Sequence, residues 1–368
     1  MRVLICGGGV IGACIAHCLS LRQIEAVVIE RIGVACAASG KSGGFLALDW
    51  CDGSPLAALA RRSFALHAEL AARFGGQWGY RRLDTLSVVA SARRSFGAAA
   101  PPALPDWVAR EALLQERLGT TATTAQVHPG EFTRGMMAAA IARGARLQIG
   151  CVSGVLRSAD DRRVTGVIVD GEPIEGDAVV IAMGPWSVLA SQWLPLPPVY
   201  GLKGHSLIFR SGEPLSPQAL FVAYEAEDGS VDSPEVFPRP DGTTCVCGLS
   251  SEAPLPLDPA GVVPDPGACE RLRAMTATFA PALAEAEVVA AQACYRPIAR
   301  DGLPLIGRIP GLDGAYVATG HSVWGILNAP ATGEAMAELI VEGGARGVDL
   351  AAFDPSRLPT LERKRAGS

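Results

Sequence analysis

The first thirty residues constrain the fold of this chain more than any other part of it. An apolar segment at residues 2–6 is followed by a glycine-rich turn at residues 7–12 and then by an Ala-, Ile- and Leu-rich segment ending at Leu21. A second apolar run at residues 26–29 ends at Glu30. The order strand, glycine turn, helix, strand and acid predicts a parallel sheet with a dinucleotide site at the carboxyl ends of its strands.

Each residue type in this unit has a physical task. Gly7 permits the tight turn, Gly9 lets the backbone approach a diphosphate, and Gly12 lets the helix pack closely on the strand. The diphosphate would lie on the free N–H groups at the positive N-terminus of the helix. The Glu30 carboxylate would accept hydrogen bonds from both ribose hydroxyls and repel a 2′-phosphate.

The rest of the chain favours FAD over NAD. A loop of small residues at 36–45 is rich in hydrogen-bond donors, so it can wrap a second part of a cofactor. An NAD-binding unit normally continues into further βαβ repeats, whereas here a helix at residues 55–75 precedes a strand at residues 84–90. Residues 314–321 and a helix ending at Val341 form a second strand, glycine turn and helix, whose N-terminus would stabilise the negative charge of a reduced flavin.

Together these motifs resemble those of the D-amino-acid oxidase superfamily of FAD-dependent oxidoreductases, which contains glycine oxidase, sarcosine oxidase and D-amino-acid dehydrogenases. They span almost the whole chain in the order that the family has. The motifs that carry the resemblance are residues 3–12 with Glu30, the loop at 39–44, residues 127–129 with 143–145, residues 178–187, residues 237–242, residues 295–297, and residues 301–307 leading to Gly320 and His321.

The resemblance implies an α/β (α+β, two-domain) fold, in which a Rossmann-like FAD-binding domain is interleaved with a smaller mixed-sheet substrate domain. The FAD-binding domain is expected at residues 1–75, 106–198 and 292–368. The substrate domain is expected at residues 76–105 and 199–291. Within it, residues 91–105 are rich in Ala and Pro and are expected to form a surface excursion.

The resemblance also implies how FAD is held. Non-covalent binding is expected, because the loop at 39–44 contains neither His nor Cys and no Cys follows Cys294. The residues expected to contact FAD are Gly7, Gly9, Val10, Ile11, Gly12, Glu30, Arg31, Ser39, Gly40, Lys41, Ser42, Gly43, Gly44, Val152, Gly184, Trp186, Gly320, His321, Gly325, Ile326 and Leu327.

A small amino acid or amine is the substrate that the resemblance implies. In relatives, the Arg of an Arg-Pro pair binds the substrate carboxylate, and Arg296 occupies this position. The substrate C–H would transfer a hydride to flavin N5 and leave an imine, with oxygen or another acceptor taking the electrons. Several relatives carry a substrate-binding Tyr about three residues before Pro238, where this chain has Glu235. Glu235 either binds a cationic amine or is a solvated charge at a strand end.

Lysine is scarce in this chain: three of its 32 basic residues are Lys41, Lys203 and Lys364. A cation at Lys41, in the loop expected beside the flavin, would stabilise reduced-flavin charge or activate oxygen. Lys203 lies at the entry to the second domain, and both lysines also fit ordinary exposed side chains. His321, at the flavin-facing turn, either contacts the cofactor or makes a local hydrogen bond. Arg296, Lys41 and His321 are therefore the catalytic candidates.

Composition excludes several other classes of protein. The net charge of −5 gives no basic surface for nucleic acid, and the ten cysteines and five histidines lack metal-ligand spacing. The apolar N-terminal segment is too short and too rich in glycine to cross a membrane, so a cytoplasmic protein is expected. A flavoprotein whose FAD is structural and whose role is assembly or trafficking stays open as an alternative. No feature of the sequence indicates an oligomeric state.

Overall fold

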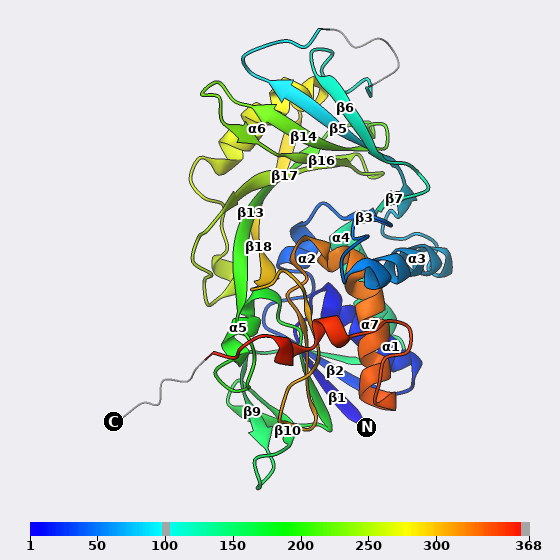
Figure 1. Ribbon diagram of the computed structural model, residues 1–368, viewed down its shortest axis with the longest axis vertical. Coiled ribbons are helices and arrows are strands. Elements are labelled where there is room, and N and C mark those ends of the chain that lie inside the picture. The colour runs from blue at the N-terminus through cyan, green and yellow to red at the C-terminus, as the bar shows by residue number, and fades with distance from the viewer. Residues whose placement is uncertain (98–103, 362–368) are drawn as a thin grey trace.

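A parallel sheet occupies the lower half of the molecule in Figure 1 and contains both strands expected at the N-terminus. The computed structural model describes residues 1–97 and 104–361. The strand order is β19-β20-β12-β1-β2-β8, and neighbouring strands are parallel except β19 and β20. The strands are β1 (Arg2–Cys6), β2 (Glu25–Glu30), β8 (Arg146–Ile149), β12 (Ala178–Ile181), β19 (Leu305–Arg308) and β20 (Ala315–Thr319).

Both faces of this sheet are covered, which explains why its central strands are apolar without alternation. Val3 and Ile5 pack into the core beneath the helices, whereas Leu4 and Cys6 pack into a core on the opposite face. The helices on the first face are α1 (Val10–Leu21), α3 (Ala57–Arg73), α4 (Pro129–Ile141) and α7 (Gly325–Glu342). The opposite face is covered by an antiparallel sheet of β9 (Val152–Arg157), β10 (Val164–Val169) and β11 (Glu172–Glu175).

Helix α7 contains Pro330, which removes a backbone donor and frees the carbonyl of Ile326 four residues earlier. Helix α3 supplies replacement partners. The Nε2 of His67 lies 2.9 Å from the Ile326 oxygen, and the Ala331 N–H donates to the Ser63 hydroxyl at 3.1 Å. The proline is therefore tolerated inside α7 because α3 satisfies the backbone groups around it.

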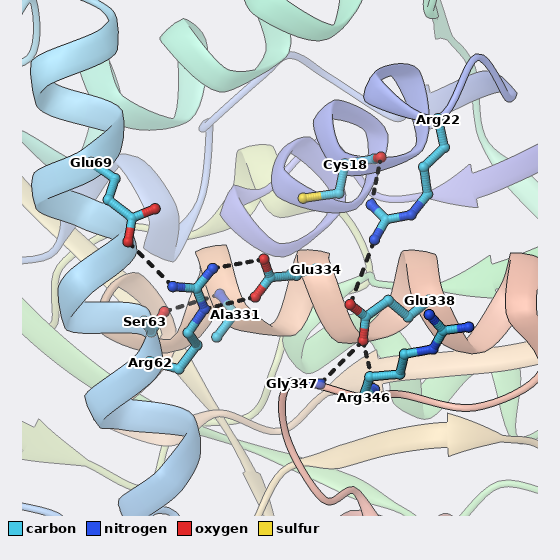
Figure 2. A network of polar contacts seen from close by, with 10 residues as sticks. All are labelled: Cys18, Arg22, Arg62, Ser63, Glu69, Ala331, Glu334, Glu338, Arg346 and Gly347. Carbon is cyan, nitrogen blue, oxygen red and sulfur yellow. Dashed lines mark hydrogen bonds and ion pairs between the residues drawn. The ribbon is translucent and has the colours of Figure 1, made fainter.

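Charged side chains join the same helices at the surface (Figure 2). Arg62 of α3 makes two hydrogen bonds, of 2.9 and 2.8 Å, to Glu334 of α7. One turn further along α7, Glu338 lies 3.6 Å from the Arg22 guanidinium after α1 and accepts the Arg346 N–H at 2.7 Å. These contacts fix α1, α3 and the end of α7 relative to one another.

A larger mixed sheet forms the upper half of the molecule (Figure 1). Its strand order is β18-β13-β17-β16-β14-β5-β6, with β15 paired to β14, and only the β14–β5 pair is parallel among the described residues. Helix α6 (Ala268–Phe279) packs on β13 and β17. The strands are β5 (Asp84–Ser91), β6 (Leu113–Gly119), β13 (Val199–Arg210), β14 (Gln218–Glu225), β15 (Val231–Asp232), β16 (Glu235–Pro238), β17 (Thr243–Ser251) and β18 (Glu287–Ala299).

The long strands β13 and β18 run between the two halves of the molecule. On the other side of the molecule, a small sheet lies between the same two halves (Figure 1). That sheet consists of β3 (Phe45–Ala47), β7 (Thr124–Gln126) and β4 (Arg81–Arg82). Shorter helices lie near the junction: α2 (Ala38–Lys41), α5 (Ser187–Ala190) and two 3-10 helices, Gly184–Trp186 and Ser322–Trp324.

Several elements start or end away from the expected positions. The helix expected from residue 55 begins at Ala57, and β6 pairs with β5 although it lies beyond the expected domain limit at residue 105. Residues 98–103 of the expected surface excursion, and residues 362–368 of the expected FAD-binding domain, lie outside the described residues. Within the described ranges, none of the helices is both long and apolar enough to cross a membrane.

Candidate active site

A cavity of about 1030 Å³ lies between the two halves of the molecule. Its walls come from the ends of β1 and β2, the loop before β3, and the start of α7 on one side. On the other side they come from β13, β16, β17 and β18 of the upper sheet. Segments from both ends of the chain therefore meet at one site.

The glycine turn after β1 has the geometry expected for a dinucleotide unit. Gly7 has φ +118°, a conformation that favours glycine, and a Cβ on Gly12 would lie 2.0 Å from the Gly7 oxygen. The N–H of Val10, the first residue of α1, donates to the Ser39 hydroxyl at 2.9 Å. Ser39 thus connects the N-terminus of α1 with the small-residue loop.

Glu30 ends β2 with its carboxylate beside the turn. One oxygen accepts the Gly8 N–H at 2.7 Å and the other accepts the Ile32 N–H at 3.0 Å. A carboxylate has further lone pairs, so these bonds orient Glu30 toward the cavity without exhausting its capacity to accept hydrogen bonds.

The loop at 38–44 is clamped between the two halves. A Cβ on Gly44 would lie 1.9 Å from the Val127 oxygen, and a Cβ on Gly43 would lie 2.3 Å from the Phe237 ring. The Lys41 Nζ donates to the Ala293 oxygen of β18 at 3.1 Å. The segment lies between Val127 on one side and the upper sheet on the other, and its glycines leave room for both contacts.

His321 precedes α7 and lines the cavity while only 3% exposed. Its Nε2 lies 3.1 Å from the Thr332 hydroxyl, and its Nδ1 has no hydrogen-bond partner among the described residues. Burial lowers the pKa of His321 to about 3, so the ring is neutral at physiological pH. Thr332 lies in α7, so this hydrogen bond joins the turn to the helix that follows it, and the ring carries no positive charge.

An arginine and a glutamate line the end of the cavity beneath the upper sheet. Arg296 of β18 donates to the Ser250 hydroxyl, and its guanidinium lies 3.7 Å from where a Cβ on Gly204 would be. Glu235 of β16 accepts a hydrogen bond from the Cys247 thiol at 3.5 Å. Burial raises the pKa of the Glu235 carboxyl, while Cys247 and the nearby Arg296 lower it.

Aromatic rings form a wall of the same end, a feature that the sequence analysis missed. The Phe45 ring lies 4.9 Å from Trp50, 5.2 Å from Phe221 and 5.8 Å from Phe237, measured between ring centroids. Trp324, after the glycine turn at Gly320, lies 6.3 Å from Trp50. All of them line the cavity. The alternation in β14 and β16 points Phe221 and Phe237 inward, but only the strand pairing brings them together.

A proline-rich loop at residues 253–266 contributes a further wall. Three side chains outside the loop bind its backbone oxygens: Trp186 donates to Pro256 at 2.8 Å, Arg31 to Leu257 at 2.9 Å, and the Tyr295 hydroxyl to Pro254 at 2.7 Å. The loop is held over the cavity from both halves of the molecule.

Most of the expected site residues lie together. Those lining the cavity are Gly7, Gly9, Val10, Ile11, Glu30, Arg31, Ser39, Lys41, Ser42, Gly43, Gly44, Val152, Gly184, Trp186, Arg296, His321, Gly325 and Ile326. Gly12, Gly40, Gly320 and Leu327 lie behind its wall. A Cβ on Gly40 would lie 2.1 Å from the Ala35 oxygen, so that glycine serves the packing of the loop.

Lys203 and Lys41, which were considered together because lysine is scarce in this chain, lie at different places in the structure. Lys203 is 6% exposed, lies outside the cavity wall and forms an ion pair of 2.5 Å with Asp265. The other Asp265 oxygen accepts the Ser251 hydroxyl. Lys203 therefore holds the end of the proline-rich loop against β13, whereas Lys41 faces the cavity.

The residues around the cavity fit FAD. Its volume suits a dinucleotide-sized ligand, with Glu30 and the N-terminus of α1 at one end and the N-terminus of α7 at the other. The Ser42 hydroxyl and His321 Nδ1 are buried polar atoms without a partner in the described part of the chain. A polar ligand between the two helix ends would give them partners.

Known proteins match the chain along almost its whole length. A family model described as FAD dependent oxidoreductase matches residues 2–339. The Schizosaccharomyces pombe protein C1F5.03c is 30% identical over 386 residues, which cover 96% of this chain and 97% of that protein. Glycine oxidase of Geobacillus kaustophilus is 29% identical over 380 residues, 96% of each chain.

A solved structure of glycine oxidase from Geobacillus kaustophilus has a TM-score of 0.80 and 25% identity, covering 97% of this chain and 99% of that one. The α/β fold expected from the sequence is thereby confirmed. The expected resemblance is confirmed as well, and the chain belongs to the FAD dependent oxidoreductase family.

Proposed function

We propose that this protein oxidises the C–N bond of a small amino acid or amine with non-covalently bound FAD and produces an imine. The observation that carries the proposal is that one cavity joins the dinucleotide turn and Glu30 to Arg296. The similarity to glycine oxidases supports a substrate with an amine and a carboxylate.

The residues proposed to hold FAD are those of the glycine turn, Glu30, the loop at 38–44, Val152, and the start of α7. Bound FAD would supply a hydride acceptor at its N5 atom. Lys41 provides a cation at the cavity wall, where it would offset negative charge on the reduced cofactor. The neutral His321 would provide a hydrogen-bonding partner instead of charge.

The other end of the cavity would bind the substrate. The planar guanidinium of Arg296 suits a carboxylate, which it can bind through two parallel hydrogen bonds. The aromatic wall of Phe45, Trp50, Phe221 and Phe237 would shield the bound substrate from water and pack against its apolar part. This lining favours an enzyme over the alternative of a flavoprotein with structural FAD.

The direct test is to mix the FAD-loaded protein anaerobically with D-, L- and N-methyl amino acids and with glycine. Reduction of the flavin is monitored by its absorbance. Bleaching by one class identifies the substrate. Arg296→Met should raise KM about tenfold or more for a carboxylate substrate, because a charged hydrogen bond is lost. Absence of bleaching with every compound would contradict the proposed activity. Acid precipitation, which should release all the flavin, tests non-covalent binding separately.

A further inference from the structure

Glu235 and Arg296 face the same cavity from different strands without pairing. Glu235 lies on β16, Arg296 on β18, and both line the cavity. Arg296 is close enough to lower the pKa of the Glu235 carboxyl, yet no direct ion pair joins the two side chains in the described part of the chain. A carboxyl and a guanidinium that line one cavity without pairing with each other are complementary to the two charges of a zwitterion.

The surroundings of Glu235 leave its carboxylate available. Its single hydrogen-bond donor among the described residues is the Cys247 thiol, a weak donor at 3.5 Å. Strand pairing places Glu235 directly opposite Cys247 on one side and Phe221 on the other. A carboxylate desolvated beside aromatic rings gains most from a cation, since the rings attract positive charge too.

We propose that Glu235 receives the ammonium group of the substrate while Arg296 receives its carboxylate, and that Glu235 takes the ammonium proton before the substrate is oxidised. This inference rests on the proposed function and names the substrate class: amino acids that enter as zwitterions, with the amine protonated.

The proposed proton transfer takes place between the substrate ammonium and the Glu235 carboxylate alone. The ammonium N–H bond breaks, its electron pair stays on nitrogen, and the proton forms an O–H bond on the Glu235 carboxylate. The neutral amine then has a free electron pair for the C=N bond that the proposed oxidation would form, and FAD, when bound, would supply the hydride acceptor. The charged or titratable groups acting on Glu235 are Cys247 and Cys245 of β17 and Arg296 of β18, while the facing residue of β14 is the uncharged Phe221.

Ligand binding tests recognition of the cation. Trimethylglycine carries a permanent cation, and tert-butylacetate is its carbon analogue with the same shape and carboxylate but no cation. The FAD-loaded wild-type protein should prefer trimethylglycine about tenfold in Kd, measured by calorimetry. Glu235→Gln should abolish the preference. Glu225→Gln is the matched control, because Glu225 lies on β14 of the same sheet but is paired with Arg93 and Arg94 outside the cavity.

The pH dependence of ligand binding by the wild-type protein gives a second test, which does not require the Glu235→Gln variant to fold. Trimethylglycine has no amine proton, so loss of its preference on acidification of the wild-type protein reports protonation of a protein carboxylate. For oxidisable substrates, Glu235→Gln should lower kcat/KM about 100-fold near neutral pH. Activity should recover at alkaline pH, where the free amine enters without losing a proton to the protein.

Two negative results separate this inference from the proposed function. A preference for trimethylglycine that persists in Glu235→Gln, or that does not change with pH in the wild-type protein, would overturn the role of Glu235 alone. If the wild-type protein binds neither ligand and no amino acid reduces its flavin, the result contradicts the proposed function itself.

Discussion

At the residue scale, His17 is a buried base without a partner. Both of its ring nitrogens lack hydrogen bonds within the described residues, and its ring packs 5.9 Å from Phe74. Burial, and then the charges of Arg143 and Arg73, lower the pKa of His17 to about 4. His67 and His321 are also buried, with pKa values lowered to about 4 and about 3.

These histidines make stability fall with acidification. An unfolded histidine titrates near pH 6.5, so between about pH 6.5 and 4 the unfolded chain binds more protons than the folded one. The free energy of unfolding is therefore highest above this window and decreases as the pH falls through it. Between pH 7 and pH 4 the free energy of unfolding should decrease by up to about 3 kcal/mol less in His17→Leu than in the wild-type protein, measured by urea unfolding. An unchanged pH slope in that variant would contradict the assignment.

Sequence analysis found residues whose tasks are local. Gly7, Gly12 and Glu30 could be predicted because their turn, packing and hydrogen bonds involve neighbours in a single strand-turn-helix unit. Phe221 was missed because its place in the aromatic wall depends on pairing with β16. Lys203 resembles Lys41 only in composition, and its partner Asp265 could not be inferred from either position.

At the element scale, α7 depends on α3 around Pro330. The Ile326 carbonyl would remain unsatisfied in the core without His67, whose side chain is fully buried. A buried carbonyl that loses its partner costs about 1–3 kcal/mol. Helix α7, whose first residues line the cavity, is thus stabilised around Pro330 by its neighbour α3.

A double-mutant cycle tests this dependence. His67→Phe should lower the free energy of unfolding by about 1–3 kcal/mol in the natural chain, measured by chemical denaturation. The loss should be smaller in a Pro330→Ala background, because residue 330 would then offer an N–H to the Ile326 carbonyl. Equal losses in both backgrounds would show that the hydrogen bond to Ile326 is not what His67 contributes.

Elements were predicted where their periodicity was undisturbed. The strand expected at residues 84–90 corresponds to β5, and the helix expected to end at Val341 corresponds to α7, which ends at Glu342. Strand β13 begins at Val199, and its first half pairs with β18. The buried Lys203 and exposed Tyr200 in that half hide the pattern of a strand.

At the scale of the whole molecule, the proposed cofactor site draws on both large sheets. A ligand that binds only the folded chain stabilises it by an amount set by its concentration over Kd, about 2.7 kcal/mol at a hundredfold excess. FAD added to flavin-free protein should therefore raise the Tm of a single unfolding transition, measured by calorimetry. FMN, which lacks the adenosine half, should raise it less because it cannot reach Glu30. Two transitions of which FAD shifts only one would contradict this coupling.

The interleaving of the two halves came from the family resemblance, since no local pattern reveals it. Strand β20 lies beside β12, and β6 lies on the far edge of the upper sheet, through contacts between distant parts of the chain. Propensity and periodicity act over a few residues, so they identify strands but not their neighbours.

The arrangement of the cavity also sets the order of events during synthesis. Its wall residues run from Gly7 to Ile326, so a growing chain has part of one wall early and lacks the rest of the cavity until residue 326 has been translated. A ribosome-bound intermediate can fold β1 and α1 and still have no enclosed site. Under the proposed function, a chain that ends before Ile326 would lack part of the cofactor site and should bind FAD more weakly than the chain described.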